Sequence, residues 1–126
     1  MDDLMSGLLV AKKEILTGGI AHNVTVNACA ELCLCESSFS HNITVSAGGS
    51  LFIASDSVAY NTTVDNFGCV WVKGTADVLH VLSGGYAHID YKARLRNLHV
   101  DSGGMVRIDS TATVGLATYE KGAVII

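Results

Sequence analysis

Proline is absent from this 126-residue chain, and aromatic residues make up only 6% of it. No apolar run approaches the roughly 20 residues that a membrane-spanning helix needs. The 13 glycines stand among many valines, isoleucines and threonines, a composition that favours strands separated by glycine turns. Because apolar residues do not recur at helical spacing over the length of an ordinary helix, the sequence predicts an all-β chain.

Basic residues are also scarce, with 8 against 12 acidic residues and a net charge of -4. This balance offers no basic patch for nucleic acid, so we expect no nucleic-acid partner. The start at Met1–Asp3 lacks the basic segment of a secretion signal, so an exported parent protein would carry its signal outside this chain. The chain has four cysteines, Cys29, Cys33, Cys35 and Cys69. They are too few for a disulfide framework and lack the C-x-x-C spacing of zinc or redox motifs. They therefore do not show whether the protein resides in an oxidising or a reducing compartment.

The chain contains an internal sequence repeat. Short strands ending in Thr-Val or His-Val recur at a constant spacing with one shorter step, and their last residues are the predicted core anchors Val26, Val45, Val64, Val81 and Val100. The shorter step is the one from Val64 to Val81, and Tyr119 continues the series after Val100. Glycines keep the same phase, as in Gly48–Gly49 and Gly103–Gly104, where corners need positive φ or close backbone approach.

A unit of this length, with two short strands, cannot bury its apolar side alone. Stacking such units about 4.8 Å apart creates a continuous core and pairs the strands. The sequence therefore predicts a parallel β-solenoid (β-helix) of about six coils of 17–19 residues. We expect one domain over residues 1–126, with residues 1–6 as a lead-in and 7–126 as repeats. The shortening of the fourth coil should fall in the turn between Val72 and Val78.

The outward-facing positions of the repeat are the place to look for function. The candidate surface ladder consists of Asn23, Thr25, Asn42, Thr44, Asn61 and Thr63. Stacked Asn and Thr side chains hydrogen-bond along a parallel sheet, which is a structural reason for them. A regular face of this kind also suits a crystalline ligand such as ice, but Val78 and Leu116 interrupt it.

No catalytic, cofactor or metal site is predicted. The histidines should stack in pairs, His22 with His41 and His80 with His99, but without a carboxylate or thiolate set expected nearby they make a weak metal site. Lys73, Asp90 and Asp109 share a column, followed by Arg94 and Arg96. That outline resembles the carboxylates and arginine of pectate-lyase-like β-helices, yet coils this short lack the long loops that enclose a cleft. We therefore expect no enzyme.

Paired glycines, an alternating strand and an N-x-T-V strand resemble the AIDA-type repeats of autotransporter adhesin passenger domains. The nearest copies are Gly18–Val26 and Ser46–Ile53, and the likeness covers residues 7–126. The second unit departs from it, with Cys29–Ala30 in place of the glycine pair. The resemblance implies export and surface display, and it implies that Ser or Thr hydroxyls somewhere on the rod are glycosylated. It also implies a right-handed coil, in agreement with the usual hand of parallel crossovers.

The expected function is a structural stalk or adhesin segment on a bacterial cell surface, or secreted, that mediates adhesion or self-association. Its expected partners are a host-cell surface, a glycan or another copy through the faces or ends of the rod, with no metal and no cofactor. The chain ends at Ala123–Ile126, in register with the start of another core strand, which predicts a fragment of a longer array. The alternatives are a glycan-binding solenoid of a phage or secreted protein and a polysaccharide lyase or hydrolase.

Overall fold

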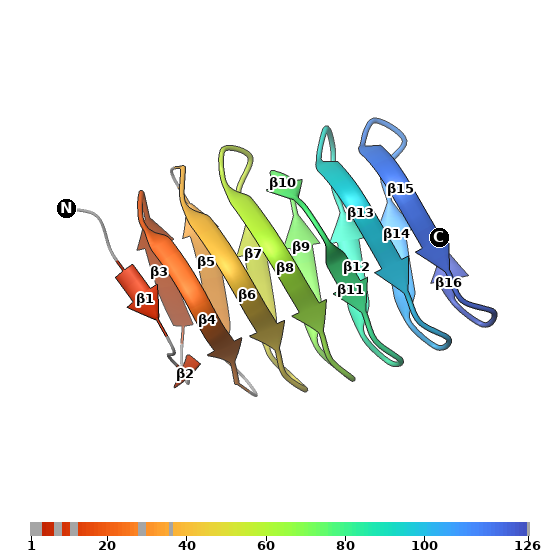
Figure 1. Ribbon diagram of the computed structural model, residues 1–126, viewed down its shortest axis with the longest axis horizontal. Helices are drawn as coiled ribbons and strands as arrows, with labels where there is room; N and C mark the ends of the chain where they lie inside the picture. Colours follow the sequence, from red (N-terminus) through yellow and green to blue (C-terminus); the bar gives the residue numbers. More distant parts are fainter. Residues whose placement is uncertain (1–3, 7–8, 11–12, 28–29, 36, 126) are drawn as a thin grey trace.

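Two parallel β-sheets make up the chain in a computed structural model, which describes residues 4–6, 9–10, 13–27, 30–35 and 37–125. Those residues form strands and turns without a helix. Figure 1 shows the sheets as two facing layers, with successive coils stacked along the long axis. The predicted all-β parallel solenoid is confirmed. The described residues include no helix of the length and hydropathy that crossing a membrane requires.

The larger sheet has nine strands and contains the Thr-Val and His-Val strand ends. Its members are β1 (Leu4–Ser6), β2 (Leu9–Val10), β4 (Ile20–Val26), β6 (Phe39–Val45), β8 (Val58–Val64), β10 (Thr75–Ala76), β11 (Leu79–Val81), β13 (Arg94–Val100) and β15 (Thr113–Tyr119). The seven-stranded sheet consists of β3 (Lys13–Thr17), β5 (Glu31–Cys35), β7 (Ser50–Ile53), β9 (Cys69–Val72), β12 (Tyr86–Ile89), β14 (Met105–Ile108) and β16 (Val124–Ile125).

The core is a set of columns that run along the rod. Five fully buried valines pair in register at successive strand ends: Val26, Val45, Val64, Val81 and Val100. The seven-stranded sheet adds a facing column, with Leu32 paired to Leu51 and Leu51 to Val70. Tyr119 pairs with Val100 but is 41% exposed, since β15 is the last strand of its sheet in chain order.

Glycine pairs form corners for two different reasons. The first glycine has a left-handed backbone, with φ of +80° at Gly48 and +86° at Gly103. The second lies against the preceding coil, where a Cβ on Gly49 would be 2.7 Å from the carbonyl oxygen of Val26. Each corner therefore combines a positive φ with a close backbone approach, and both requirements favour glycine.

The shortened coil loses its length from one turn. Ile53 pairs with Val72 at the usual register offset, whereas Val58 pairs with Thr75 at a smaller one. The turn between those pairs is therefore reduced to Lys73–Gly74, within the segment that the sequence predicted. The core column continues unchanged, because Val64 still pairs with Val81.

The first rung begins earlier than expected. Leu4 pairs with Ile20, and Val10 pairs with Val26, so β1 and β2 already belong to the nine-stranded sheet. The lead-in predicted over residues 1–6 is wrong in its boundary. The register offset from Leu4 to Ile20 is smaller than the offset between later rungs. A search for the period of the later rungs therefore does not detect the first rung.

Candidate functional site

The outer face of the nine-stranded sheet carries the predicted ladder, and we call it the ladder face. Its three asparagines have left-handed backbones, with φ of 54°, 57° and 56° at Asn23, Asn42 and Asn61. Asparagine tolerates this conformation better than most side chains do. Each asparagine bends its strand. Asparagine is therefore favoured at these three positions by the backbone conformation as well as by side-chain contacts, which the sequence did not predict.

Contacts along the rod axis supplement this backbone role. The Nδ2 of Asn42 donates a hydrogen bond of 3.0 Å to the Oδ1 of Asn23. The threonines of the same face pair in register and are half-buried: Thr25, Thr44 and Thr63. The sheet thus presents a polar row of asparagine and threonine side chains over β4, β6 and β8.

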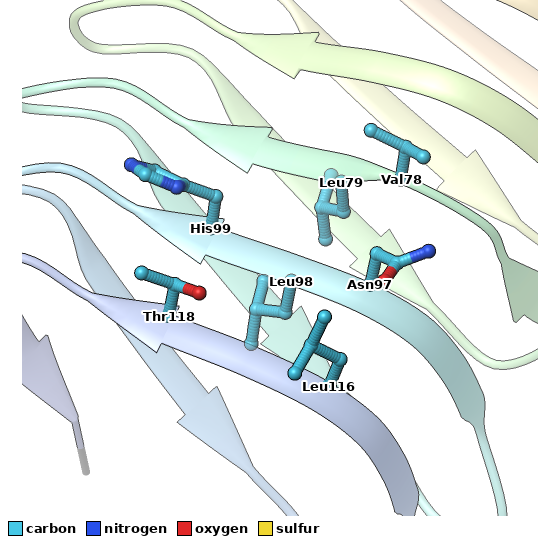
Figure 2. Close-up of a pocket in the computed structure, with 7 residues that line it drawn as sticks. All are labelled: Val78, Leu79, Asn97, Leu98, His99, Leu116 and Thr118. Atoms are coloured by element: carbon cyan, nitrogen blue, oxygen red, sulfur yellow. The ribbon is translucent and has the colours of Figure 1, made fainter.

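The character of the ladder face changes after the shortened coil. Val78 and Leu116 replace asparagine, and neither has a positive φ. Figure 2 shows these residues beside a shallow hollow of about 180 Å³ between β11, β13 and β15. Its lining consists of Val78, Leu79, Asn97, Leu98, His99, Leu116 and Thr118. The sequence indicated that Val78 and Leu116 interrupt the row of asparagines. In the structure the ladder face changes there from polar to partly apolar.

A group that we call the histidine–aspartate cluster borders this hollow and consists of His80, His99 and Asp101. His80 on β11 pairs with His99 on β13, and their ring centroids are 4.6 Å apart. The Oδ1 of Asp101 lies 2.9 Å from Nε2 of His80 and 3.0 Å from Nε2 of His99. The hydrogen bond with His80, followed by its charge and that of His99, lowers the pKa of Asp101 below the ordinary 3.8.

The expectation that no carboxylate lies near these histidines is wrong. Besides Asp101, Glu120 places its Oε1 3.5 Å from Nε2 of His99. The sequence could have predicted this contact, because His99 and Asp101 are separated by one residue along an extended path and so project to one side. The other expected pair, His22 and His41, also lies side by side, with the rings edge to face and their centroids 6.1 Å apart.

The seven-stranded sheet carries an aromatic group that the sequence analysis did not identify. The rings of Trp71 and His88 stack at 4.3 Å, and Trp71 Nε1 donates a 2.7 Å hydrogen bond to Oδ2 of Asp90. The backbone N–H of Tyr91 also donates to Asp90. These two hydrogen bonds, the one from Tyr91 first, lower the pKa of Asp90.

The column considered for polysaccharide cleavage, Lys73, Asp90 and Asp109, lines neither the hollow beside Val78 and Leu116 nor a second one. The second hollow, of about 420 Å³, is lined by Arg94 and Arg96 with Leu95, Thr113 and Gly115, but by neither Asp90 nor Asp109. Asp109 accepts hydrogen bonds from the hydroxyl and backbone N–H of Thr111, which lower its pKa. Both carboxyls are therefore held ionised near neutral pH, which does not suit a proton donor.

Two cysteines lie side by side on the seven-stranded sheet. Cys33 and Cys35 alternate with buried leucines on β5, and their Sγ atoms are 2.6 Å apart. Burial raises the pKa of the Cys69 thiol, which lowers its reactivity near neutral pH. Cys29 lies outside the described residues.

Comparison of the whole chain with solved structures finds a similar fold. The match is a crystal structure of a TibC-catalyzed hyper-glycosylated TibA fragment, residues 55–350, with a TM-score of 0.61 and 20% sequence identity. It covers 98% of this chain and 54% of that one, so the chain spans about half the length of the solved protein. The solenoid is thus an architecture already observed by crystallography.

Comparisons of sequence find less. No family model matches the chain, and no curated protein matches it. At 20% identity, the likeness to TibA concerns the fold. The AIDA-type resemblance of the repeats therefore stays a prediction.

Proposed function

We propose that this chain is a stalk and adhesin segment of a passenger domain displayed on a bacterial surface or secreted from it. The observation that carries the proposal is the ladder face, a row of Asn and Thr on a stacked parallel sheet. The likeness to TibA, an autotransporter adhesin, supports this role. The stacked coils provide length and stiffness, while the exposed polar rows provide a repeated contact surface.

We assign adhesion to the ladder face, with a cell-surface glycan as the ligand. Asn and Thr side chains supply the donors and acceptors that sugar hydroxyls need. Copies of one rung repeat about every 4.8 Å, so weak contacts add along the rod. The test is attachment of beads coated with the chain to epithelial cells, with binding to a glycan array as a second readout.

The decisive variant is Thr25→Lys with Thr63→Lys, which places two charges two rungs apart on the ladder face. The matched control is Phe52→Lys with His88→Lys, which has the same rung spacing on the seven-stranded sheet. We expect the ladder variant to abolish attachment and the control to retain it. Equal loss in both variants, or no attachment by the unchanged chain, would contradict the assignment.

Self-association is the second contact that we propose, for this chain taken by itself, through the coil of β15 and β16. Val124 and Ile125 are about half exposed on β16, and β15 leaves one edge without a following strand in its sheet. Exposed edges pair readily with other strands. Sedimentation velocity should show concentration-dependent association that Ile125→Lys reduces; a monomer at all concentrations would rule out this contact.

Glycosylation of surface hydroxyls belongs to the same proposal, because the similar TibA fragment is hyper-glycosylated by TibC. Co-expression of this chain with TibC, followed by intact-mass measurement, tests it directly. Added sugar masses on Ser or Thr peptides are the expected result. An unchanged mass would show that the fold alone does not make the chain a TibC substrate.

A further inference from the structure

The histidine–aspartate cluster has the composition of a metal site. Two imidazole Nε2 atoms and one carboxylate oxygen from His80, His99 and Asp101 all lie within 4.8 Å of one another. The three side chains are partly exposed, with 39%, 39% and 34% of their area accessible. They are accessible to an ion and are anchored on β11, β13 and the turn after β13.

The arrangement follows from the solenoid register. Parallel pairing stacks His80 directly beside His99, as Figure 1 indicates by the adjacent strands β11 and β13. Asp101 then follows β13, and its backbone N–H donates to the carbonyl oxygen of Val81, which fixes the start of the turn. Because the pairing of β11 with β13 and the start of the following turn hold the ligand residues in place, little further ordering is needed to bring them together.

The histidine–carboxylate distances are close to those around a tetrahedral ion. Zinc bonds of about 2.0–2.2 Å to imidazole nitrogen and carboxylate oxygen place neighbouring ligand atoms about 3.4 Å apart. The two histidine–aspartate separations, 2.9 and 3.0 Å, are a few tenths of an ångström shorter, and the His99–Glu120 separation is 3.5 Å. Side-chain rotations that lengthen these two contacts would admit the ion.

We propose that His80, His99 and Asp101 bind one divalent transition-metal ion, with Zn²⁺ as the best match and Glu120 as a fourth ligand. Imidazole and carboxylate ligands suit Zn²⁺, whereas Ca²⁺ and Mg²⁺ prefer oxygen ligands alone. The bound ion would link three consecutive coils, because His80, His99 and Glu120 belong to successive rungs. It would thereby stabilise the rod just beyond the shortened coil.

The experiment is a Zn²⁺ titration of the full chain by competition with a chromophoric chelator. We expect one ion per chain for the unchanged protein. His99→Gln and Asp101→Asn should each weaken binding by at least about tenfold, since even loss of an outer-shell partner costs that much. Glu120→Gln should have a smaller effect, because its oxygen is the most distant.

The matched control is His22→Gln with His41→Gln, which removes the other stacked histidine pair of the same sheet. The control should bind Zn²⁺ as the unchanged chain does. Zn²⁺ should raise the melting temperature of the unchanged chain and of the control, but not that of Asp101→Asn. Far-UV circular dichroism identifies any variant that fails to fold.

Co²⁺ in place of Zn²⁺ distinguishes this site from the thiols of Cys33 and Cys35. A site of nitrogen and oxygen ligands gives no thiolate-to-cobalt charge-transfer band in the near ultraviolet. Such a band, the absence of one-to-one binding, or equal weakening in the His22 and His41 control would each overturn the proposal.

Discussion

At the scale of single residues, backbone conformation decides which side chains the corners of the rod accept. Gly48 and Gly84 occupy the left-handed corner position, each with φ of +80°. Phe67 occupies the same position in the coil between them, with φ of +63° and 74% of its area exposed. A left-handed conformation costs a residue with a Cβ about 1–2 kcal/mol. Phe67 therefore carries backbone strain without burying its ring in return.

Replacing Phe67 with glycine should stabilise the fold. We expect the free energy of unfolding to rise by about 0.5–1 kcal/mol, because relief of the strain exceeds the added entropy of glycine in the unfolded chain. Urea unfolding measures the change. The control is Tyr91→Gly, an exposed turn aromatic whose φ is not positive, and it should destabilise. A loss of stability in Phe67→Gly would contradict this account.

The contact between Asp90 and Trp71 gives a pH dependence that can be observed directly. The folded pKa of Asp90 lies below its ordinary value of 3.8, so the ionised form stabilises the fold above that value. This contribution is lost as the pH falls through the lower folded pKa. Since Trp71 is the single tryptophan, its emission should shift with a midpoint below pH 3.8.

Asp90→Asn is the control for that titration, because the amide retains an oxygen acceptor but does not ionise. The acid shift in Trp71 emission should disappear in this variant. Far-UV circular dichroism separates the local change from acid unfolding. A midpoint above the ordinary value would show that the hydrogen bonds from Tyr91 and Trp71 do not favour the carboxylate.

At the scale of elements, the turns decide how much a coil can shorten. The turn Lys73–Gly74 replaces a longer turn of the preceding coil, and the chain then lies directly against that coil. A Cβ on Gly74 would collide with the carbonyl oxygens of Ala54 and Ser57. Those oxygens belong to backbone held by a 3.0 Å hydrogen bond from Ser57 N to Ala54 O. The shortened turn is therefore compatible only with a glycine at this position.

Gly74→Ala should consequently destabilise the rod by about 1–3 kcal/mol, the usual cost of overpacking a tight contact. Lys73→Ala, at the exposed neighbouring position, should change stability by less than about 0.5 kcal/mol. Urea unfolding compares the two variants with the unchanged chain. Equal stability of Gly74→Ala would mean that the turn can move away from the preceding coil.

At the scale of the whole molecule, each coil contacts only its neighbours, so local stability depends on having coils on both sides. Core residues of the central coils, such as Val64 and Val70, are fully buried. Toward the last coil the equivalent positions become accessible, with Tyr119 and Ile125 both substantially exposed. The rod is therefore expected to open from this end.

Amide hydrogen exchange should reveal this gradient. We expect the amides of β6 and β8 to exchange at least about a hundredfold more slowly than those of β15 and β16, because the last coil opens without unfolding the centre. Mass spectrometry of peptic peptides from each coil measures the difference. Equal protection along the rod would indicate that the chain unfolds as one unit.

Much of the fold was predictable because the repeat encodes it directly. Alternation of side chains assigns Val45 to the interior and Thr44 to the ladder face, and the phase of the glycines marks the corners. The left-handed bend at Asn42 was not predicted, since a stacked asparagine pattern is equally consistent with an extended strand. The first rung was missed because its offset differs from that of the others.

The sequence by itself determined the parallel stack, its core columns and the position of the shortened turn, because a fixed period leaves one register that buries every apolar face. Only the tertiary structure decided which polar side chains meet. Asp101 and His80 lie on different coils, as do Trp71 and Asp90, so their contacts depend on rotamers and on the bend of each turn. Periodicity assigns a residue to a face of the rod, but packing determines the distances between side chains on that face.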